Sequence, residues 1–305
     1  MSQAQSIAYW PHRTYNWGRW DNDLGTLNHL DSEAVRRGME CVRTHEVLTL
    51  GSPLRRDEIA PNGGFAHRML HAKKYDFGPK EEPVFEAADE FTVAIHGMTN
   101  AHIDAYAHVG HRGLSFNGAR FDDIVSVEGK AQRMSIDQMG GIVTRGWLVD
   151  APRQRGLEFL TPGDPVTPDD LAHLEGLVAP GDALIIRTGR FSAPLVMPDD
   201  AEARDDHGNW SGLHVDCVEL IHAWDVSTVA TDGPGDNFPS TCAECSVPIH
   251  ILFEAYLGLP LIHHLDLERL SQSIEGREQK AVMFMVAPLV LPNGTGSPVN
   301  PIAIL

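Results

Sequence analysis

Apolar and polar positions follow two periods along the chain, one typical of helices and one typical of buried strands. In residues 31–44, apolar side chains recur at helical spacing after two candidate N-caps, Asp31 and Ser32. Short apolar runs such as GWLVDAP and DALIIRTGRF, bounded by Gly, Pro and Asp, are typical of strands covered on both faces. Residues 214–236 and 246–270 each have a helical pattern followed by a strand-like one. Because helices and strands alternate repeatedly, the pattern predicts the α/β class.

The length of 305 residues suits one large hydrophobic core. We therefore expect a single domain over residues 1–305, with an N-terminal extension over about residues 1–50. Residues 64–89 have weak periodicity and predict a loop or hairpin that lies over a site. Residues 194–212 are polar and acidic and predict a second surface excursion. Residues 287–305 are apolar enough to be buried against a neighbouring copy.

Composition narrows the function classes. Hydrophobic residues make up 42% and charged residues 22%, which is typical of a globular protein, and the net charge of −18 disfavours nucleic acid and anionic membranes as partners. No apolar run approaches the roughly 20 residues that span a bilayer, and the first residues lack the order of a signal peptide, so we expect a cytoplasmic protein. The few cysteines agree with a reducing compartment, and Cys242 and Cys245 are interpreted as plain thiols.

The segment HGMTNAHIDAYAH concentrates histidines around an aspartate. If the chain up to Asp104 is extended, His96, Met98, His102 and Asp104 point to one face. A helical turn after Asp104 would place His108, four residues later, beside that carboxylate. Imidazoles and a carboxylate that converge in this way suit Zn²⁺ or Mn²⁺, and a histidine beside the metal can move protons.

A second group of histidines lies near the C-terminus. His250 begins an apolar helix, and His263 and His264 lie in the strand-like segment that follows. Buried imidazoles need polar partners. Either each of these histidines has its own hydrogen-bond partner, or one shared metal ion satisfies several of them together; we favour the metal.

At these residues the sequence resembles the putative cyclase family of metal-dependent hydrolases, which includes bacterial kynurenine formamidases, isatin hydrolases and trans-dienelactone hydrolase. The HIDAYAH segment matches the end of the family motif H-x-G-T-H-x-D-x-P-x-H, with His102 and Asp104 at ligand positions and His108 at the catalytic position. WGRWDNDLGTLNHLDSEAV, LSFNG, VSTVATDGPGD and PIHILFEAYLGLPLIHHLDLERL resemble further segments of the family, so the likeness extends along nearly the whole chain. The resemblance implies a swivelling β/β/α fold with a mixed central sheet.

The chain departs from the family pattern at three positions. Met98 occupies the place of the first motif histidine, which His96 can replace, and Tyr106 occupies that of the motif proline. His263 occupies the place of a second-metal glutamate. A site with few carboxylates favours one ion over two. The expected metal ligands are therefore His102, Asp104, His250 and His263, with His96 as a further candidate.

The expected reaction is attack of a metal-activated water on an amide, lactone, lactam or formamide carbonyl, with His108 as the acid–base group. Two alternatives remain open: a metal-dependent lyase or isomerase on the same scaffold, and a non-catalytic relative whose site has decayed. The partners expected are a small-molecule substrate and a second copy, in a homodimer or higher homo-oligomer.

Other polar and aromatic residues have weaker patterns. His67, His71 and His111 fit surface positions better than a pocket. Asp232 fits a ligand loop and a structural turn equally well. Glu254 lies one helical turn after His250 and is a candidate to orient that histidine. Trp17 and Trp20 fit a core better than a substrate contact.

Overall fold

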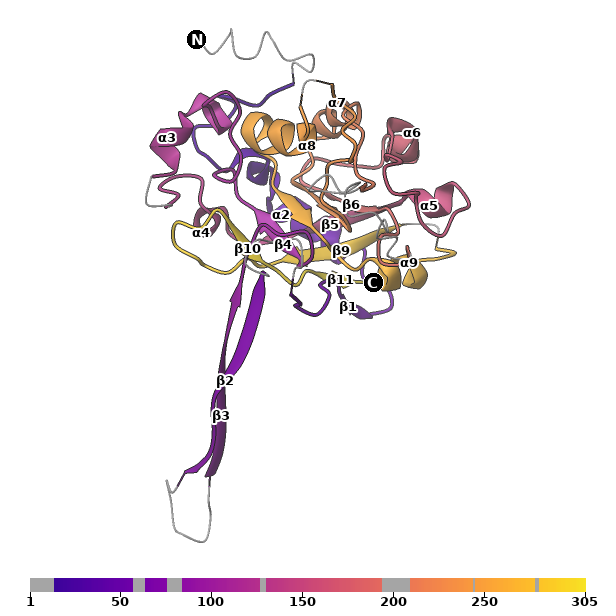
Figure 1. Ribbon diagram of the computed structural model, residues 1–305. Coiled ribbons are helices and arrows are strands. Elements are labelled where there is room, and N and C mark those ends of the chain that lie inside the picture. The colour runs from indigo at the N-terminus through magenta and orange to yellow at the C-terminus, as the bar shows by residue number, and fades with distance from the viewer. Residues whose placement is uncertain are drawn as a thin grey trace.

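The computed structural model describes residues 14–56, 64–75, 84–126, 130–193, 209–243, 245–277 and 280–305. Their main element is a nine-stranded sheet with the order β1-β11-β9-β5-β6-β7-β8-β4-β10 (Figure 1). The strands of this sheet are β1 (Val47–Thr49), β4 (His102–Asp104), β5 (Ile142–Asp150), β6 (Ala183–Arg187), β7 (Thr228–Thr231), β8 (Leu261–His263), β9 (Ala281–Val286), β10 (Gly296–Pro298) and β11 (Ile302–Ile304).

The centre of the sheet is parallel and its flanks are antiparallel. β5, β6, β7 and β8 pair in parallel, whereas β9, β11 and β1 on one side and β4 and β10 on the other pair antiparallel. Parallel neighbours need crossover connections, and these run through helices on the sheet. The expected α/β class with a mixed central sheet is confirmed.

Alternating side chains of the central strands enter two different cores. In β5, Val149 packs into the core beneath the helices, whereas its neighbour Leu148 packs into the core on the opposite face. In β8, Leu261 and Ile262 divide in the same way. Strands buried on both faces consist of continuous apolar residues, which is why these runs are recognisable in the sequence.

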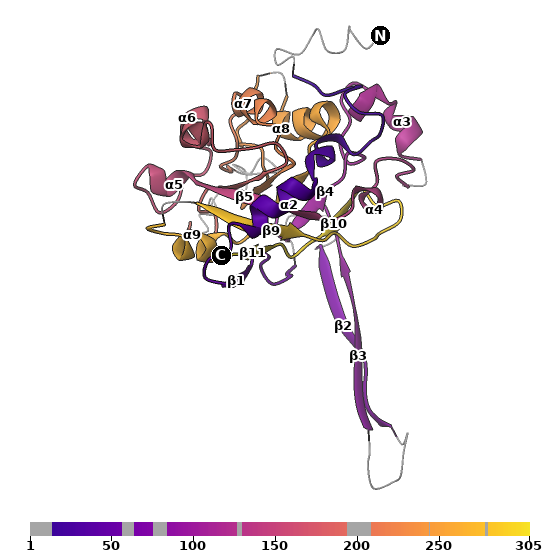
Figure 2. The ribbon, with the colours of Figure 1, turned by 180° about the vertical axis from the view of Figure 1, so that it is seen from behind.

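Short helices connect and cover the strands, and Figure 2 shows the same arrangement from behind. They are η1 (Gly25–His29), α2 (Ser32–Met39), η2 (Phe116–Gly118), α3 (Phe121–Ile124), α4 (Ile136–Met139), α5 (Ala151–Gln154), α6 (Pro168–Leu171), η3 (Ala172–Leu174), α7 (Cys217–Ala223), α8 (Pro248–His250), the π-helix η5 (Ile251–Leu257) and α9 (Glu268–Ser273). The helix predicted over residues 31–44 is shorter, and its N-cap is Asp31, which accepts a hydrogen bond from the Ala34 amide. No helix among the described ranges is long and apolar enough to cross a membrane.

A long hairpin leaves the body of the protein. β2 (Phe65–Tyr75) and β3 (Val84–Val93) form a separate two-stranded sheet, with a register irregularity between Met69 and His71. The hairpin projects away from the nine-stranded sheet (Figure 1). A hairpin was one of the two forms predicted here, but the expectation that it lies over a site is wrong. The other predicted excursion lies largely in residues 194–208, outside the described ranges.

Two local predictions around the histidine motif are wrong. Residues 94–101 form bends rather than a continuous strand: β3 ends at Val93 in the two-stranded sheet, and β4 of the nine-stranded sheet begins at His102. The residues after Asp104 form a turn, in which the His108 amide donates to the Ala105 carbonyl, instead of a helix.

Candidate metal centre

Two neighbouring strands place three of the predicted ligands on one face of the sheet. His102 and Asp104 are two residues apart in β4, so the pleat turns both to the same side. His263 in β8 is the direct cross-strand partner of His102. All three side chains are buried. The face-sharing predicted for His102 and Asp104 therefore holds within this short strand.

The carboxylate of Asp104 lies at the centre of the histidines. Its Oδ2 is 2.8 Å from Nε2 of His263 and 3.8 Å from Nε2 of His250. Its Oδ1 is 2.8 Å from Nδ1 of His96 and 3.6 Å from Nε2 of His102. Oδ1 thus faces His96 and His102, and Oδ2 faces His250 and His263. The possible metal ligands therefore form two groups, one with each pair of histidines, and both groups contain Asp104.

His250 reaches the site from the helices above the sheet. Pro248 occupies the first turn of α8, and His250 joins this helix to the π-helix η5. The Nδ1 of His250 is hydrogen-bonded to Asp236, a buried carboxylate that also accepts a hydrogen bond of 2.7 Å from the Ile249 amide. This contact directs Nε2 of His250 toward Asp104, in the way that carboxylates commonly orient metal-binding histidines.

Glu254 does not have the role predicted for it. It lies inside η5 and is fully buried, and neither carboxyl oxygen makes a hydrogen bond with the residues described here. Burial, together with the charges of Asp104 and Asp236, raises the pKa of Glu254 well above its usual value. The residue that orients His250 is Asp236, which the sequence analysis did not single out. Its one signal is its place at the end of the GPGD segment, four residues after Asp232.

His108 lies beside the ligands without contacting Asp104 directly. Its ring stacks on that of His96, with 3.5 Å between centroids and 2° between planes. The Nε2 of His96 is 2.9 Å from Oγ1 of Thr295, so His96 is held from both ring nitrogens. Burial lowers the pKa of His108 to about 3, which leaves the imidazole neutral at neutral pH.

His264 has a different hydrogen-bond partner from His263. Its Nδ1 contacts the guanidinium of Arg190, which also donates a hydrogen bond of 2.6 Å to the Met98 carbonyl. The buried Asp232 accepts hydrogen bonds from the Thr188, Gly189 and Arg190 amides. Asp232 is therefore a structural turn residue, and Arg190 ties the segment around Met98 to the end of β8. Of the two adjacent histidines, His263 is the one that meets Asp104.

The electrostatics of the cluster favour a cation. Although burial opposes ionisation, the imidazoles of His263 and His102 hold the pKa of Asp104 well below its usual range. Burial lowers the pKa of His102 to about 3 and also lowers that of His263, so both are neutral donors. Burial also acts to lower the pKa of His250, but Asp236 outweighs it and raises that pKa. An ionised carboxylate beside the neutral imidazoles of His102 and His263 is the protonation state that a divalent ion requires, and His250 would release its proton on binding the ion.

The spacing of the donor atoms also fits a metal. Ligand bonds of 2.0–2.1 Å in a tetrahedral site place the donor atoms roughly 3.3 Å apart. The separations between Asp104 oxygens and the nitrogens of His102, His250 and His263 lie between 2.8 and 3.8 Å. The Nδ1 of His263 is buried with no hydrogen-bond partner among the described residues. The residues present therefore fit a divalent cation.

The remaining histidines and the aromatic residues lie elsewhere. His67 and His71 are on the hairpin, where they face Asp89 and Glu86. His111 is hydrogen-bonded to the hydroxyl of Tyr256. Trp17 stacks on this tyrosine with 5.3 Å between centroids and donates to the Ala255 carbonyl, which supports its interpretation as a packing residue. Neither Cys242 nor Cys245 belongs to the groups of possible metal ligands found in the described part of the chain.

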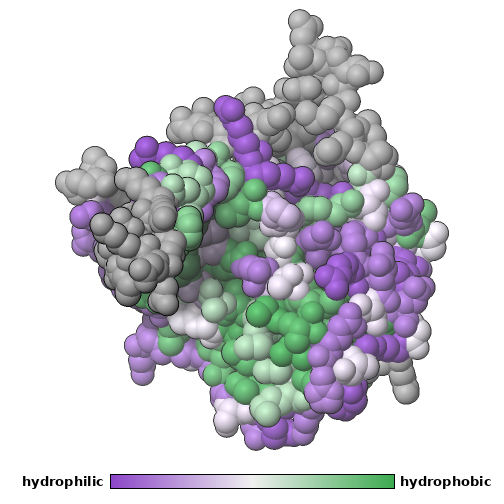
Figure 3. All heavy atoms as spheres, turned by 90° about the horizontal axis from the view of Figure 1, so that it is seen from below, coloured by the Kyte–Doolittle hydropathy of each residue, from purple (hydrophilic) through white to green (hydrophobic). Residues whose placement is uncertain are grey.

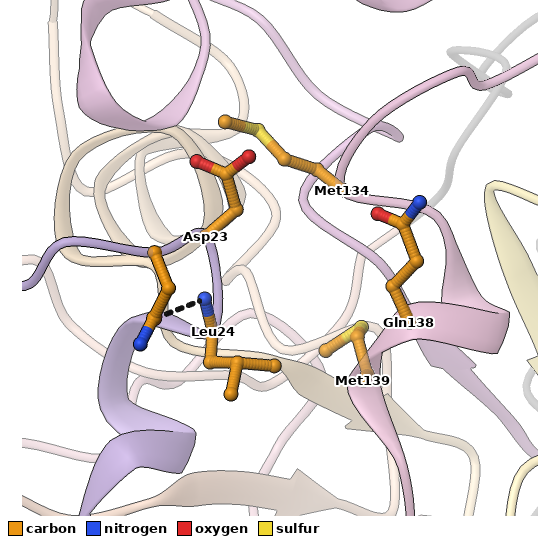
Figure 4. Close-up of a pocket in the computed structure, with 6 residues that line it drawn as sticks. Asp23, Leu24, Met134, Gln138 and Met139 are labelled. Atoms are coloured by element: carbon orange, nitrogen blue, oxygen red, sulfur yellow. Dashed lines mark hydrogen bonds between the residues drawn. The ribbon is translucent and has the colours of Figure 1, made fainter.

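A pocket of about 320 Å³ has no histidine among its lining residues. It is lined by Asn22, Asp23, Leu24, Met134, Gln138 and Met139. Figure 4 shows Met134, Gln138 and Met139 on one side of this pocket and Asp23 and Leu24 on the other. It contains no pair of groups suited to metal binding or proton transfer, so we assign the site to the histidine cluster.

The metal-free protein is expected to lose stability in acid because of these histidines. The pKa values of His102 and His108 are about 3 in the folded chain and near 6.5 in the unfolded chain. Below pH 6.5 the unfolded chain binds more protons, so the free energy of unfolding falls as pH drops toward 3, by up to about 1.4 kcal/mol per pH unit for each histidine. Urea unfolding at several pH values checks this slope; an unfolding free energy that stays constant between pH 6.5 and 4 would contradict it.

Removal of the Asp236 carboxylate is expected to loosen the metal without removing it. Asp236→Asn loses the charge that orients His250, and comparable contacts change metal affinity about 10–100-fold. Titration calorimetry with Zn²⁺ and with Mn²⁺ measures the change. The exposed Asp169, replaced by Asn, is the control and should bind like the wild type. Equal affinities for the two variants would show that Asp236 has no part in the site.

Comparisons with known proteins identify the family and the fold. The sequence profile described as putative cyclase matches residues 26–236. The fold is similar to a crystal structure of a novel cyclase, with a TM-score of 0.82 and 24% identity over 95% of this chain and 99% of that one. It is also similar to isatin hydrolase A from Labrenzia aggregata, with a TM-score of 0.56 and 19% identity over 87% and 94% of the two chains.

A third similar structure is that of a potential metal-dependent hydrolase with cyclase activity, with a TM-score of 0.50 and 15% identity over 85% and 98% of the two chains. No curated protein matches the chain. The profile match covers more than half of the sequence and includes His96, His102, Asp104 and His108. This chain therefore belongs to the putative cyclase family.

Proposed function

We propose that the protein is a metal-dependent hydrolase that breaks the bond between the carbonyl carbon and the nitrogen or oxygen of a cyclic amide, lactone or formamide. One observation carries the proposal: the ionised Asp104 lies among imidazoles from two distant parts of the chain, with the neutral His108 beside them. Two similar structures, described as an isatin hydrolase and a potential metal-dependent hydrolase, support the reaction class.

The residues of the chain divide into ligands and a proton carrier. We propose that His102, Asp104, His250 and His263 would hold the ion, with His96 as a further candidate. In the described residues these side chains form two groups that share Asp104: His96, His102 and Asp104 in one, and Asp104, His250 and His263 in the other. When bound, a divalent ion supplies a Lewis acid and lowers the pKa of water to about 7. His108 accepts the proton of the attacking water and returns it to the nitrogen or oxygen that leaves. Its stacking on His96 holds the ring in place for both transfers.

We propose Zn²⁺ or Mn²⁺ as the ion, because both take nitrogen and oxygen ligands. We favour one ion per chain. Among the described residues, Asp104 is the carboxylate that contacts imidazoles on both sides, and burial raises the pKa of Glu254 well above its usual value, which disfavours its charged form. A second ion next to the first would lack a charged ligand of its own.

The test combines metal content with isotope labelling. The purified protein, loaded with Zn²⁺ or Mn²⁺ and washed, should retain about one equivalent of metal by mass spectrometry. A panel of cyclic amides, lactones and N-formyl aromatic amines in ¹⁸O-labelled water should give a carboxylate that contains ¹⁸O. Turnover without ¹⁸O in the product would indicate a lyase or isomerase instead. Less than about a tenth of an equivalent of metal, with no turnover, would indicate a decayed site.

A further inference from the structure

His264 directly follows β8 and lies beside the histidines of the metal centre. In a regular strand, consecutive side chains lie on opposite faces of the sheet. His264 instead has a φ of +60°, in the left-handed region that non-glycine residues seldom adopt. Its ring and that of its neighbour His263 both lie near His102, with 5.5 and 5.0 Å between ring centroids. A residue held in this conformation within a polar cluster is a candidate for a functional role.

The contact with Arg190 determines which ring nitrogen of His264 carries the proton. A guanidinium has donors only, so the Nδ1 that it contacts is the acceptor and carries no proton. The neutral imidazole then has its proton on Nε2. Arg190 is itself held by its hydrogen bond to the Met98 carbonyl, and its Cζ lies 4.3 Å from the centre of the Trp210 ring. His264 is therefore a neutral hydrogen-bond donor in a fixed orientation.

The Nε2 of His264 donates to no group within the described part of the chain. The hydrogen bond of this side chain is the one that it accepts from Arg190 through Nδ1. His264 is only 1% exposed. The Nδ1 of His263 is sealed from solvent without a partner, whereas the Nε2 of His264 is not among such sealed atoms. A donor on a side chain buried to this degree needs an acceptor, and a bound molecule can supply it.

The cluster is open to solvent where the segment that follows the hairpin enters it. His96 and His108 keep solvent exposure, whereas His102 and His263 are buried. Residues 94–101, which include His96, join β3 to β4. Seen from the side toward which the hairpin points, the surface beside the hairpin is largely apolar (Figure 3). A substrate that enters past this surface meets few competing donors, so the donor for its carbonyl oxygen has to belong to the cluster.

The chemistry of the proposed reaction calls for such a donor. When water adds to a carbonyl group, negative charge develops on the carbonyl oxygen, and a fixed N–H group stabilises that charge. A neutral imidazole can act in this way without giving up its proton. The ring nitrogens of His96, His102 and His250 already face carboxylates, a hydroxyl or a backbone carbonyl. His108 is assigned to proton transfer, which leaves His264 as the donor.

We propose that His264 is a catalytic residue of the hydrolysis proposed above, on which this inference rests, and that its Nε2–H donates a hydrogen bond to the carbonyl oxygen of the substrate. Arg190 is the positioning residue that keeps the proton of His264 on Nε2. The hydrogen bond strengthens as negative charge develops on the oxygen, so His264 acts on kcat more than on KM. His108 carries the proton of the attacking water, and His264 stabilises the oxygen on which the charge collects.

Variants of His264 that lose or keep a donor test this role. His264→Leu removes the donor and should lower kcat about 10²–10³-fold for any panel substrate that the wild type hydrolyses, with KM and metal content little changed. His264→Gln places an amide N–H near the position of Nε2 and should keep kcat within about tenfold of the wild type. His173→Leu, at an exposed position, is the control and should behave like the wild type. Thermal unfolding shows whether each variant is folded.

Nitrogen-15 NMR of the zinc-loaded protein tests the tautomer independently of activity. In protein labelled at histidine, the His264 signals are identified by their loss in His264→Gln. They should show a protonated Nε2 and an unprotonated Nδ1. Arg190→Met should give a mixture of tautomers and lower kcat about 10–100-fold, whereas Arg190→Lys, which still donates, should keep the wild-type tautomer. The two Arg190 variants also decide the question if His264→Leu does not fold.

Three results would overturn the inference. A folded His264→Leu protein with wild-type kcat would show that the reaction does not use this donor. Loss of metal together with activity in this variant would make His264 a ligand. A proton on Nδ1 of His264 in the wild type would leave Nε2 without a hydrogen to donate. These results leave the proposed function standing, whereas a wild type that hydrolyses no panel compound would contradict that function and this role with it.

Discussion

Asp104→Asn is expected to lower the affinity of the protein for Zn²⁺ or Mn²⁺ at least about a thousandfold. The variant keeps the shape of the side chain but loses the negative charge that faces the imidazoles of His96, His102, His250 and His263. Neutral imidazoles alone cannot offset the charge of a buried divalent ion as well as a carboxylate can. Titration calorimetry gives the affinity, and mass spectrometry of the washed protein gives the metal content.

The control for this substitution is Asp216→Asn, because the Asp216 side chain is 61% exposed and lies outside the cluster. It should retain the wild-type metal content. Thermal unfolding of both variants without metal shows whether Asp104→Asn still folds. Full metal retention in a folded Asp104→Asn protein would mean that the ion binds elsewhere, and the proposed centre would be wrong.

His108→Gln is expected to lower kcat about 10²–10⁴-fold while the metal content and KM change little, since a glutamine cannot accept the proton. The ring of His108 stacks on His96 but does not contact Asp104 directly, so its loss leaves the ligands in place. Steady-state kinetics with any substrate from the panel above measures the effect. In the wild type, protonation of His108 should lower kcat at acidic pH. This decrease should be absent from the pH profile of the variant.

The exposed His173, replaced by Gln, serves as the matched control and should keep wild-type kcat. A His108→Gln protein that keeps wild-type kcat with a full complement of metal would assign proton transfer to another group. A variant that loses metal together with activity would instead place His108 among the ligands.

The sequence carried most of the information about the class of the fold. The apolar runs of β5 and β6 are recognisable because strands that contact a core on each face have no polar alternation. The sequence contains less information about β4, because this strand has only three residues. The segment before it bends where an extended chain was predicted, because the path of residues 94–101 depends on contacts with distant residues, such as that between Met98 and Arg190. Such contacts have no local signal.

In the candidate site, too, local spacing could be read from the sequence, whereas contacts between distant residues could not. His102 and Asp104 could be paired from their spacing, since two residues is the repeat of a strand. That His263 lies opposite His102 depends on which strands are neighbours, and one sequence does not contain that information. Asp236 was missed because an aspartate after Gly-Pro-Gly is typical of any turn. Its contact with His250 results from the packing of this turn against α8.

The π-helix η5 ties the direction of one candidate metal ligand, His250, to the length of one segment. Its wide turns run from His250 to Gly258, which ends the helix with a φ of +59° and packs against Phe116. Each residue rotates direction by about 100° around a regular helix axis. If one residue were deleted here, the segment would form an ordinary α-helix. The chain would still contain every histidine. The His250 side chain, however, would point in a different direction, away from Asp104. Counting residues between ligands is therefore as informative as identifying them.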